Sequence, residues 1–223
     1  MYVIPPEQNG DFVAAMEAVL RTYHLPLNQN VPVICMDEQP VQLIGETKVP
    51  IPARSGRPDL FDYEYRRNGT TNIFMFTEPL SGWREARVST TKTKQDWARE
   101  VADLLERCYP NAERVTLICD NLSTHTLGAL YETFPPDRAS RLSARLNLQH
   151  TPKHGSWLNI AECELSVFTR QCLSRRISNE AKLRREANAW SVHRNGQQRG
   201  VEWQFTTNDA RIKLKRLYPQ IQT

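Results

Sequence analysis

The chain has 223 residues, of which 39% are apolar and 24% charged, so its composition is that of a folded globular protein and not of a disordered one. No apolar run approaches the roughly 18 residues that a membrane-spanning helix needs, and the N-terminal sequence does not have the pattern of a secretory signal. The length fits one large domain. The cysteines include no Cys-x-x-Cys pair, so we interpret them as buried thiols in a reducing compartment, with the cytoplasm as the expected location; they are Cys35, Cys108, Cys119, Cys163 and Cys172.

Charge is divided unevenly along the chain. Residues 1–165 contain 17 Lys/Arg and 21 Asp/Glu, a net charge of −4, whereas residues 166–223 contain 12 Lys/Arg and 4 Asp/Glu, a net charge of +8. A basic region beside an acidic body suggests a polyanionic partner such as nucleic acid. A basic surface that contacts only solvent explains the uneven charge equally well.

The first predicted elements are a helix and then strands. Apolar residues with helical spacing predict an amphipathic helix over residues 9–23. The run Val31–Gln39 is nearly all apolar up to Asp37 and predicts a strand that is buried on both faces and ends at that aspartate. Asn68-Gly69 between β-rich segments predicts a hairpin turn, so the early strands are expected to be antiparallel. These further strands are expected at residues 41–49, 63–67, 70–76 and 83–90.

The second half of the chain is predicted to be mostly helical. A capping-box-like start at Thr93 precedes a helix that ends before Pro110. A second buried strand, residues 114–119, ends at Asp120, and Ser156 is a suitable N-cap for the last core helix. The other predicted elements are helices at 127–134 and 137–146, a strand at 147–150, and basic helices at 178–195 and 209–217.

Two buried strands that each end in an aspartate can place Asp37 and Asp120 side by side, which would be the start of a metal site. Either aspartate alone is equally well explained as a residue that caps a turn. In the last core helix, Glu162 and Glu164 lie roughly 80° to either side of the apolar stripe, at about 100° per residue. The helical wheel therefore leaves open which glutamate faces the aspartates. Carboxylate oxygens suit Mg²⁺, and two such ions about 3.5–4 Å apart support phosphodiester chemistry.

Several longer segments resemble a known family. They are Met36-Asp37-Glu38-Gln39, Cys119-Asp120-Asn121 with His125, and the run from Thr151 to Glu162, which includes Pro-Lys-His-Gly-Ser-Trp-Leu-Asn. Weaker likeness lies in residues 43–47, 203–207 and 209–216. In these segments the chain resembles the catalytic part of DDE transposases of bacterial insertion sequences, in the branch related to the mariner superfamily. The resemblance covers nearly all of the chain.

The resemblance implies an α/β, ribonuclease H-like fold, with a mixed five-stranded sheet flanked by helices and a basic helical C-terminal extension. It implies one catalytic domain over residues 1–223, divided into an N-terminal helix and linker (1–30), a core (31–175) and the basic extension (176–223). It implies that Asp37, Asp120 and Glu162 are catalytic and bind two Mg²⁺ ions, or Mn²⁺, and so it selects Glu162 over Glu164.

The activity implied is metal-dependent cleavage of DNA at the ends of the element, followed by transfer of the freed 3′ hydroxyl into target DNA. DNA would be the partner of a dimer or larger assembly, in the cytoplasm and on the nucleoid, with no membrane involved. Lys153, His154, Arg170, Arg175 and Arg176 are the predicted nucleic-acid contacts, because Arg and Lys dominate phosphate contacts. For His125 and His154, a role beside the metal ligands or at DNA is as well supported as that of an ordinary loop histidine.

One departure from the family leaves alternatives open. Related transposases usually carry helix-turn-helix domains before the catalytic domain, whereas this sequence starts almost directly at the catalytic part. An excised domain, a split reading frame and a truncated relic are all consistent with this. Two other functions also remain: a ribonuclease H-like nuclease that only hydrolyses, and an inactive remnant that only binds nucleic acid.

Overall fold

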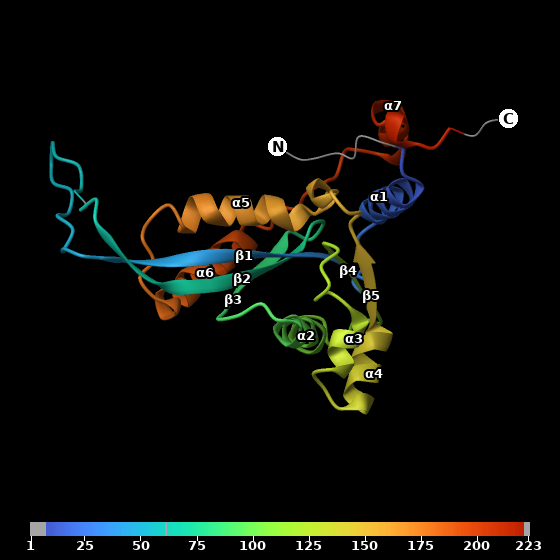
Figure 1. Cartoon of the computed structure of the whole chain (residues 1–223), viewed down its shortest axis with the longest axis horizontal. Helices are drawn as coiled ribbons and strands as arrows, with labels where there is room; N and C mark the ends of the chain where they lie inside the picture. Colours follow the sequence, from blue (N-terminus) through green and yellow to red (C-terminus); the bar gives the residue numbers. More distant parts are fainter. Residues whose placement is uncertain (1–7, 61, 221–223) are drawn as a thin grey trace.

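A computed structural model describes residues 8–60 and 62–220, and it shows one mixed sheet with helices on both faces (Figure 1). The strand order is β3-β2-β1-β4-β5; β2 pairs antiparallel with β1 and β3, and β4 pairs parallel with β1 and β5. This arrangement confirms the predicted ribonuclease H-like fold and its mixed five-stranded sheet. The strands are β1 (Val33–Glu46), β2 (Tyr65–Glu78), β3 (Trp83–Ser89), β4 (Val115–Cys119) and β5 (Leu146–His150).

The helices form two layers around the sheet. One hydrophobic core joins the sheet to α1, α5 and α6, and a second joins its other face to α2, α3 and α4. A π-helical turn (Leu104–Cys108) continues α2, and 3-10 turns cover Ser156–Leu158 and Lys215–Leu217. The α-helices are α1 (Gly10–Tyr23), α2 (Lys94–Asp103), α3 (Leu127–Tyr131), α4 (Pro136–Arg145), α5 (Ile160–Cys172), α6 (Glu180–Gly196) and α7 (Thr207–Lys213).

The predicted hairpin turn at Asn68-Gly69 is wrong. Strand β2 runs straight through these residues, and its pairing with β1 shifts register between Gln42 and Ile44, opposite this point. Gly69 has a φ of 99°, a backbone conformation that glycine adopts without steric cost. Asn-Gly therefore marks a β-bulge, a feature that shares with hairpin turns the need for a positive φ.

The connection between β1 and β2 is instead a long arm, residues 47–64, that projects from the body of the molecule (Figure 1). Arg176 holds the base of this arm. Its guanidinium donates to Glu46 Oε2 at 2.5 Å and to the carbonyl oxygens of Asp62 and Glu64 at 2.8 and 3.1 Å. The arm exposes apolar residues at its surface, including Val49 and Tyr63.

The basic C-terminal region contacts the same core as the rest of the chain. In α6, Leu183, Ala187 and Trp190 are buried in the core that α5 also lines, and the Trp190 ring meets the Phe168 ring edge-on at 5.2 Å. The proposed division into residues 1–30, 31–175 and 176–223 stays a prediction; its first seven and last three residues lie outside the described part of the chain.

Two smaller predictions have clear outcomes. Thr93 and Asp96 form the predicted capping box at the start of α2. The cysteines are free thiols, but Cys163 is exposed and Cys108 is only half-buried, so the expectation that all five are buried is wrong for these two residues. None of the described helices is both long and apolar enough to cross a membrane.

Candidate metal centre

The pairing of β1 with β4 places the two aspartates next to each other. The parallel register aligns Cys35 with Ile118, and two more residues along each chain lead to Asp37 and Asp120. Side chains alternate between the faces of a strand, so both aspartates belong to the face on which Cys35 and Ile118 meet α1 and α5. The partner of Asp37 on β2 is Met75, which lies in the same core.

The prediction that Asp37 ends its strand is wrong. Strand β1 continues through Glu46, because β2 pairs with it along this whole stretch. What ends beside Asp37 is the neighbouring strand β4, whose last residue is Cys119. Asp37 is therefore held by the pairing of β1 with β2 on one side, and on its other side lies the end of β4.

The structure separates the two glutamates that the helical wheel left open. Glu164 is buried, and its carboxylate accepts a hydrogen bond from Arg84 Nη2 at 3.0 Å, with Arg194 Nη2 at 3.4 Å. The Arg84 side chain is only 1% exposed. Glu164 thus neutralises a buried arginine, whereas Glu162, in the first turn of α5, is half-buried and faces Asp37 closely enough to affect its ionisation.

The predicted N-cap of this helix, Ser156, is wrong, because it begins a 3-10 turn and α5 starts later, with Asn159 as its N-cap. The Asn159 side chain accepts from the Ala161 amide at 3.1 Å and donates to the Met36 carbonyl oxygen at 2.8 Å. Met36 directly precedes Asp37. The first turn of α5, which carries Glu162, is therefore joined to β1 beside the first aspartate.

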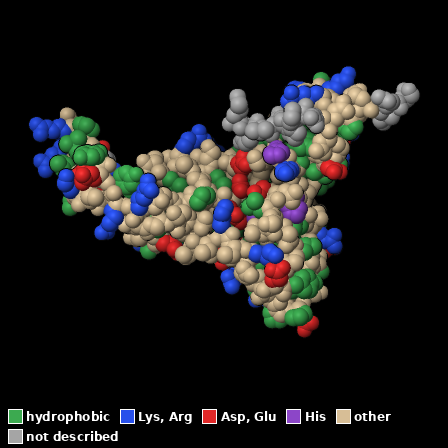
Figure 2. All heavy atoms as spheres, in the orientation of Figure 1, with side chains coloured by type: hydrophobic (Ala, Val, Ile, Leu, Met, Phe, Trp, Pro, Cys, Tyr) green, Lys and Arg blue, Asp and Glu red, His purple; other side chains and the backbone are tan. Residues whose placement is uncertain are grey.

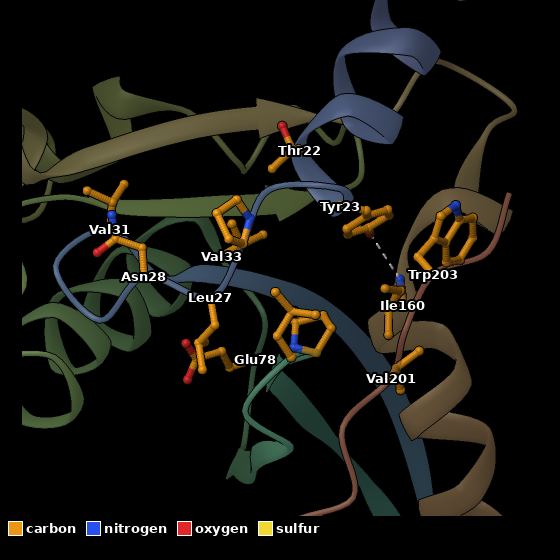
Figure 3. A pocket seen from close by; sticks show the side chains of 13 residues that line it. Thr22, Tyr23, Leu27, Asn28, Val31, Val33, Glu78, Ile160, Val201 and Trp203 are labelled. Carbon is orange, nitrogen blue, oxygen red and sulfur yellow. Dashed lines mark hydrogen bonds between the residues drawn. The ribbon is translucent and has the colours of Figure 1, made fainter. Parts of the chain in front are cut away.

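A second contact fixes the same end of α5. The Tyr23 hydroxyl donates to the Leu158 carbonyl oxygen at 2.6 Å and accepts from the Ile160 amide at 3.4 Å. Figure 3 shows the contact between Tyr23 and Ile160 as a dashed line, with Trp203 nearby, among the residues that line a pocket. Sequence reasoning missed both Asn159 and Tyr23; Asn159, a residue type favoured at N-caps, was the available signal.

Electrostatics around Asp37 indicate a concentration of negative charge. Burial raises the pKa of Asp37 to about 7, and repulsion from Asp120, Glu162 and Glu38 adds to the increase, although the Glu38 amide donates to Asp37 Oδ1 at 2.7 Å. Acidic side chains gather on this face beside the N-terminal end of α5, with lysines, arginines and histidines nearby (Figure 2). A cation bound beside Asp37 would favour the ionised form of this carboxyl group at neutral pH.

The donor set fits a hard divalent cation. All three acids offer carboxylate oxygens, which hard cations prefer. Asp120 Oδ1 is buried and accepts no hydrogen bond of good geometry among the described residues, although the His125 imidazole lies 2.7 Å away. Within the same described part of the chain, no three His, Cys, Asp or Glu side chains are already drawn together closely enough to hold an ion. For Asp37, Asp120 and Glu162 to share a cation, their carboxylates would therefore have to move closer together.

His125 lies directly behind Asp120. Its Nδ1 donates to the Asp120 carbonyl oxygen at 3.2 Å and lies 2.7 Å from Asp120 Oδ1, and its Nε2 is 2.9 Å from Glu38 Oε1. Burial lowers the pKa of His125, but the contacts with Asp120, Cys119 and Glu38 outweigh burial and raise it well above its ordinary value. The ring stacks on Trp97 of α2, with centroids 5.6 Å apart.

The predicted nucleic-acid contacts fall into two groups. Lys153 and His154 are exposed in the loop after β5 and line a hollow together with Asn121, the residue after Asp120. His154 has a φ of 65°, an uncommon conformation outside glycine. Arg170 is exposed in the last turn of α5, Arg175 pairs with Glu186, and Arg176 holds the base of the arm.

A model of a known protein family matches this chain. The family model described as "DDE superfamily endonuclease" matches residues 32–184, more than half of the chain and all three acids. The chain belongs to the DDE superfamily endonuclease family. A comparison with curated protein sequences gave no match.

Solved structures of the Mos1 mariner transposase share the fold of this DDE endonuclease. The Mos1 paired-end complex with Mg superposes with a TM-score of 0.62 at 15% identity, covering 98% of this chain and 66% of the Mos1 chain. A pre-cleavage Mos1 transpososome gives 0.61 at 14% identity, covering 99% and 66%. The paired-end complex with Mn gives 0.55 at 16% identity, covering 86% and 58%. The chain thus spans less than two thirds of the length of these Mos1 chains.

Proposed function

We propose that this chain is the catalytic domain of a DNA transposase of the mariner-related, insertion-sequence branch, which cleaves DNA in a metal-dependent reaction and transfers a 3′ hydroxyl into target DNA. The observation that carries the proposal is that Asp37 lies on β1 and Asp120 directly follows the adjacent parallel strand β4, with Glu162 in the first turn of α5 close enough to raise the pKa of Asp37. Family membership supports the chemistry, because it covers all three residues.

In this proposal the three carboxylates hold Mg²⁺ or Mn²⁺, with two ions as the expected number. Such ions activate a water or hydroxyl nucleophile and stabilise the leaving oxygen of a phosphodiester. The chain contributes the positions of the ligands: the Glu38 amide orients the Asp37 carboxylate, and Asn159 joins the helix of Glu162 to β1. The Mos1 paired-end complexes with Mn and with Mg support this choice of metal.

DNA would approach the acids past the loop after β5. Lys153 and His154 are the best-placed contacts, since they line the hollow next to Asp120 and are exposed. Arg170, Arg175 and Arg176 would contact DNA farther along α5, and for Arg175 and Arg176 this competes with their ion pairs to Glu186 and Glu46. The Mos1 neighbours are paired-end complexes, which supports a dimer or larger assembly on DNA, and a nucleoid location follows from such a substrate.

The test is cleavage of supercoiled plasmid and strand transfer from a pre-cut DNA end, with Mg²⁺, Mn²⁺ or Ca²⁺. The wild type should cleave with Mg²⁺ or Mn²⁺, and Ca²⁺ should support binding alone because its coordination is looser. Asp37→Asn should fold and bind DNA but not cleave. Cleavage without a joined product would instead favour the hydrolysis-only nuclease, and cleavage by purified Asp37→Asn would remove Asp37 from the metal site.

A further inference from the structure

The residue after the first aspartate, Glu38, has no place in the proposed metal site. Its neighbour in β2 is Phe74, which lies in the core beneath α2, so alternation directs Glu38 away from Asp37 and Glu162. Its side chain is only 3% exposed. A buried carboxylate is costly unless it is paired, and the partner of Glu38 is His125.

His125 connects this buried carboxylate to the second aspartate. The imidazole is 1% exposed, with Nε2 at 2.9 Å from Glu38 Oε1 and Nδ1 against both the carbonyl and the carboxylate of Asp120. Trp97 covers one face of the ring. The ring therefore has one orientation, and both of its nitrogens are engaged. Lys92, 3.8 Å from Glu38 Oε2, is the other charged neighbour of Glu38 and is far more exposed.

We propose that Glu38 and His125 are positioning residues for the metal site: Glu38 fixes the His125 ring, and the ring fixes Asp120 through its contacts with the Asp120 carbonyl and carboxylate. This rests on the proposed function, since it assigns Asp120 as a ligand. Two consecutive residues of β1 then have different roles. Asp37 binds metal on one face of the strand, and Glu38 acts on Asp120, through His125, from the opposite face. Residues that orient a metal ligand from behind typically affect metal affinity 10–100-fold.

Replacing His125 by asparagine or by glutamine separates its contact with Asp120 from its contact with Glu38. The amide nitrogen of Asn reaches the position of Nδ1, so His125→Asn keeps a donor for Asp120 and loses the contact with Glu38. The amide nitrogen of Gln reaches the position of Nε2, so His125→Gln keeps Glu38 and loses Asp120. Glu38→Ala removes only the contact between Glu38 and His125, so its Mn²⁺ affinity should match that of His125→Asn.

The experiment measures Mn²⁺ affinity directly, from the electron paramagnetic resonance signal of free Mn²⁺, together with the melting temperature of each variant. His125→Gln should weaken Mn²⁺ binding about 10–100-fold, and His125→Asn and Glu38→Ala should each weaken it less than His125→Gln does. The double variant Glu38→Ala/His125→Gln should bind as His125→Gln does, because Glu38 acts through His125. Exposed controls, His193→Gln and Glu132→Gln, should bind as the wild type does.

Three results would overturn the inference. Unchanged Mn²⁺ affinity in folded His125→Gln and Glu38→Ala would make both residues packing elements only. If the loss of Mn²⁺ affinity in the double variant equals the product of the losses in the two single variants, Glu38 does not act through His125. Complete loss of binding in Glu38→Ala, equal to that of Asp37→Asn, would make Glu38 a ligand. If His125→Gln does not fold, His125→Asn and Glu38→Ala still decide the question. A wild type that binds no Mn²⁺ would instead refute the proposed function itself.

Discussion

Asn159 donates its side-chain amide to the carbonyl oxygen of Met36 at 2.8 Å, across 123 positions of sequence. The same side chain caps α5 by accepting from the Ala161 amide. One buried residue therefore sets where the helix begins and how it meets β1, and so it sets the approach of Glu162 to Asp37.

Replacing Asn159 by Ala should cost more than the loss of an ordinary cap. We expect about 1 kcal/mol from the lost cap and about 1–3 kcal/mol more from the unpaired Met36 carbonyl, measured by urea unfolding. The matched control is Asn179→Ala, an exposed N-cap of α6 whose side chain accepts from the Lys182 amide at 2.8 Å and otherwise makes, among the described residues, only a 3.4 Å contact with the adjacent Ser178 hydroxyl. Its loss should cost about 1 kcal/mol. Equal losses in the two variants would show that the bond to Met36 contributes nothing.

The two glutamates of α5 should respond in opposite ways to substitution. Glu164→Ala leaves buried Arg84 without its partner, and breaking a buried pair costs about 3–5 kcal/mol, so this variant should be strongly destabilised. Glu162→Gln removes one of several repelling carboxylates, so the free energy of unfolding should hold or rise while cleavage disappears. Denaturant unfolding and the plasmid assay on both variants check this. A stable, inactive Glu164 variant beside an active Glu162 variant would reverse the assignment.

Metal binding should depend on pH near neutrality. The pKa of Asp37 is raised to about 7 by burial and by its acidic neighbours, so protons compete with the cation below that pH, and Mn²⁺ affinity should fall as pH drops from 8 to 6. Between about pH 4 and 7 the metal-free fold binds a proton that the unfolded chain does not. The stability of the metal-free protein should therefore decrease as pH rises through this window.

The control for this pH effect is Asp37→Asn, which cannot titrate. With EDTA present, the difference in unfolding free energy between Asp37→Asn and the wild type should grow as pH rises from 5 to 8. A difference that does not change with pH would mean that Asp37 keeps an ordinary pKa in the folded chain.

Lys153 offers a test of how DNA approaches the acids. Lys153→Ala should weaken binding to all sequences alike and lower the salt dependence by about one counterion, because a phosphate contact releases one condensed ion. Lys94→Ala is the matched control, since Lys94, the first residue of α2, pairs with Glu132. Fluorescence anisotropy over a salt series measures both. An unchanged salt slope for Lys153→Ala would place the DNA path elsewhere.

The sequence predicted most of the sheet, because continuous apolar runs such as Val115–Cys119 mark buried strands. It failed where one local signal serves two structures: Asn68-Gly69 suits a hairpin turn and a bulge equally, and only the pairing of β1 with β2 distinguishes them. The role of Glu164 depends on Arg84, 80 positions away, which no helical wheel contains.

The contacts that position the candidate site were likewise beyond local patterns. Glu38, His125 and Asn159 act through partners on other elements, so their roles follow from the register of the sheet. Two apolar runs that each lead into an aspartate suggested Asp37 and Asp120, and the family resemblance selected Glu162. That the two aspartates are neighbours follows from β1 and β4 being adjacent and parallel, and the bond from Asn159 to Met36 joins the helix of Glu162 to β1 beside Asp37.

The most direct test of the account is the position of Mn²⁺ in a crystal of this protein, located by anomalous scattering. The account predicts one or two peaks within coordination distance of carboxylate oxygens of Asp37, Asp120 and Glu162, at about 2.0–2.3 Å, and their loss in Asp37→Asn. Well-ordered Mn²⁺ bound elsewhere, with these three carboxylates free of metal, would contradict it.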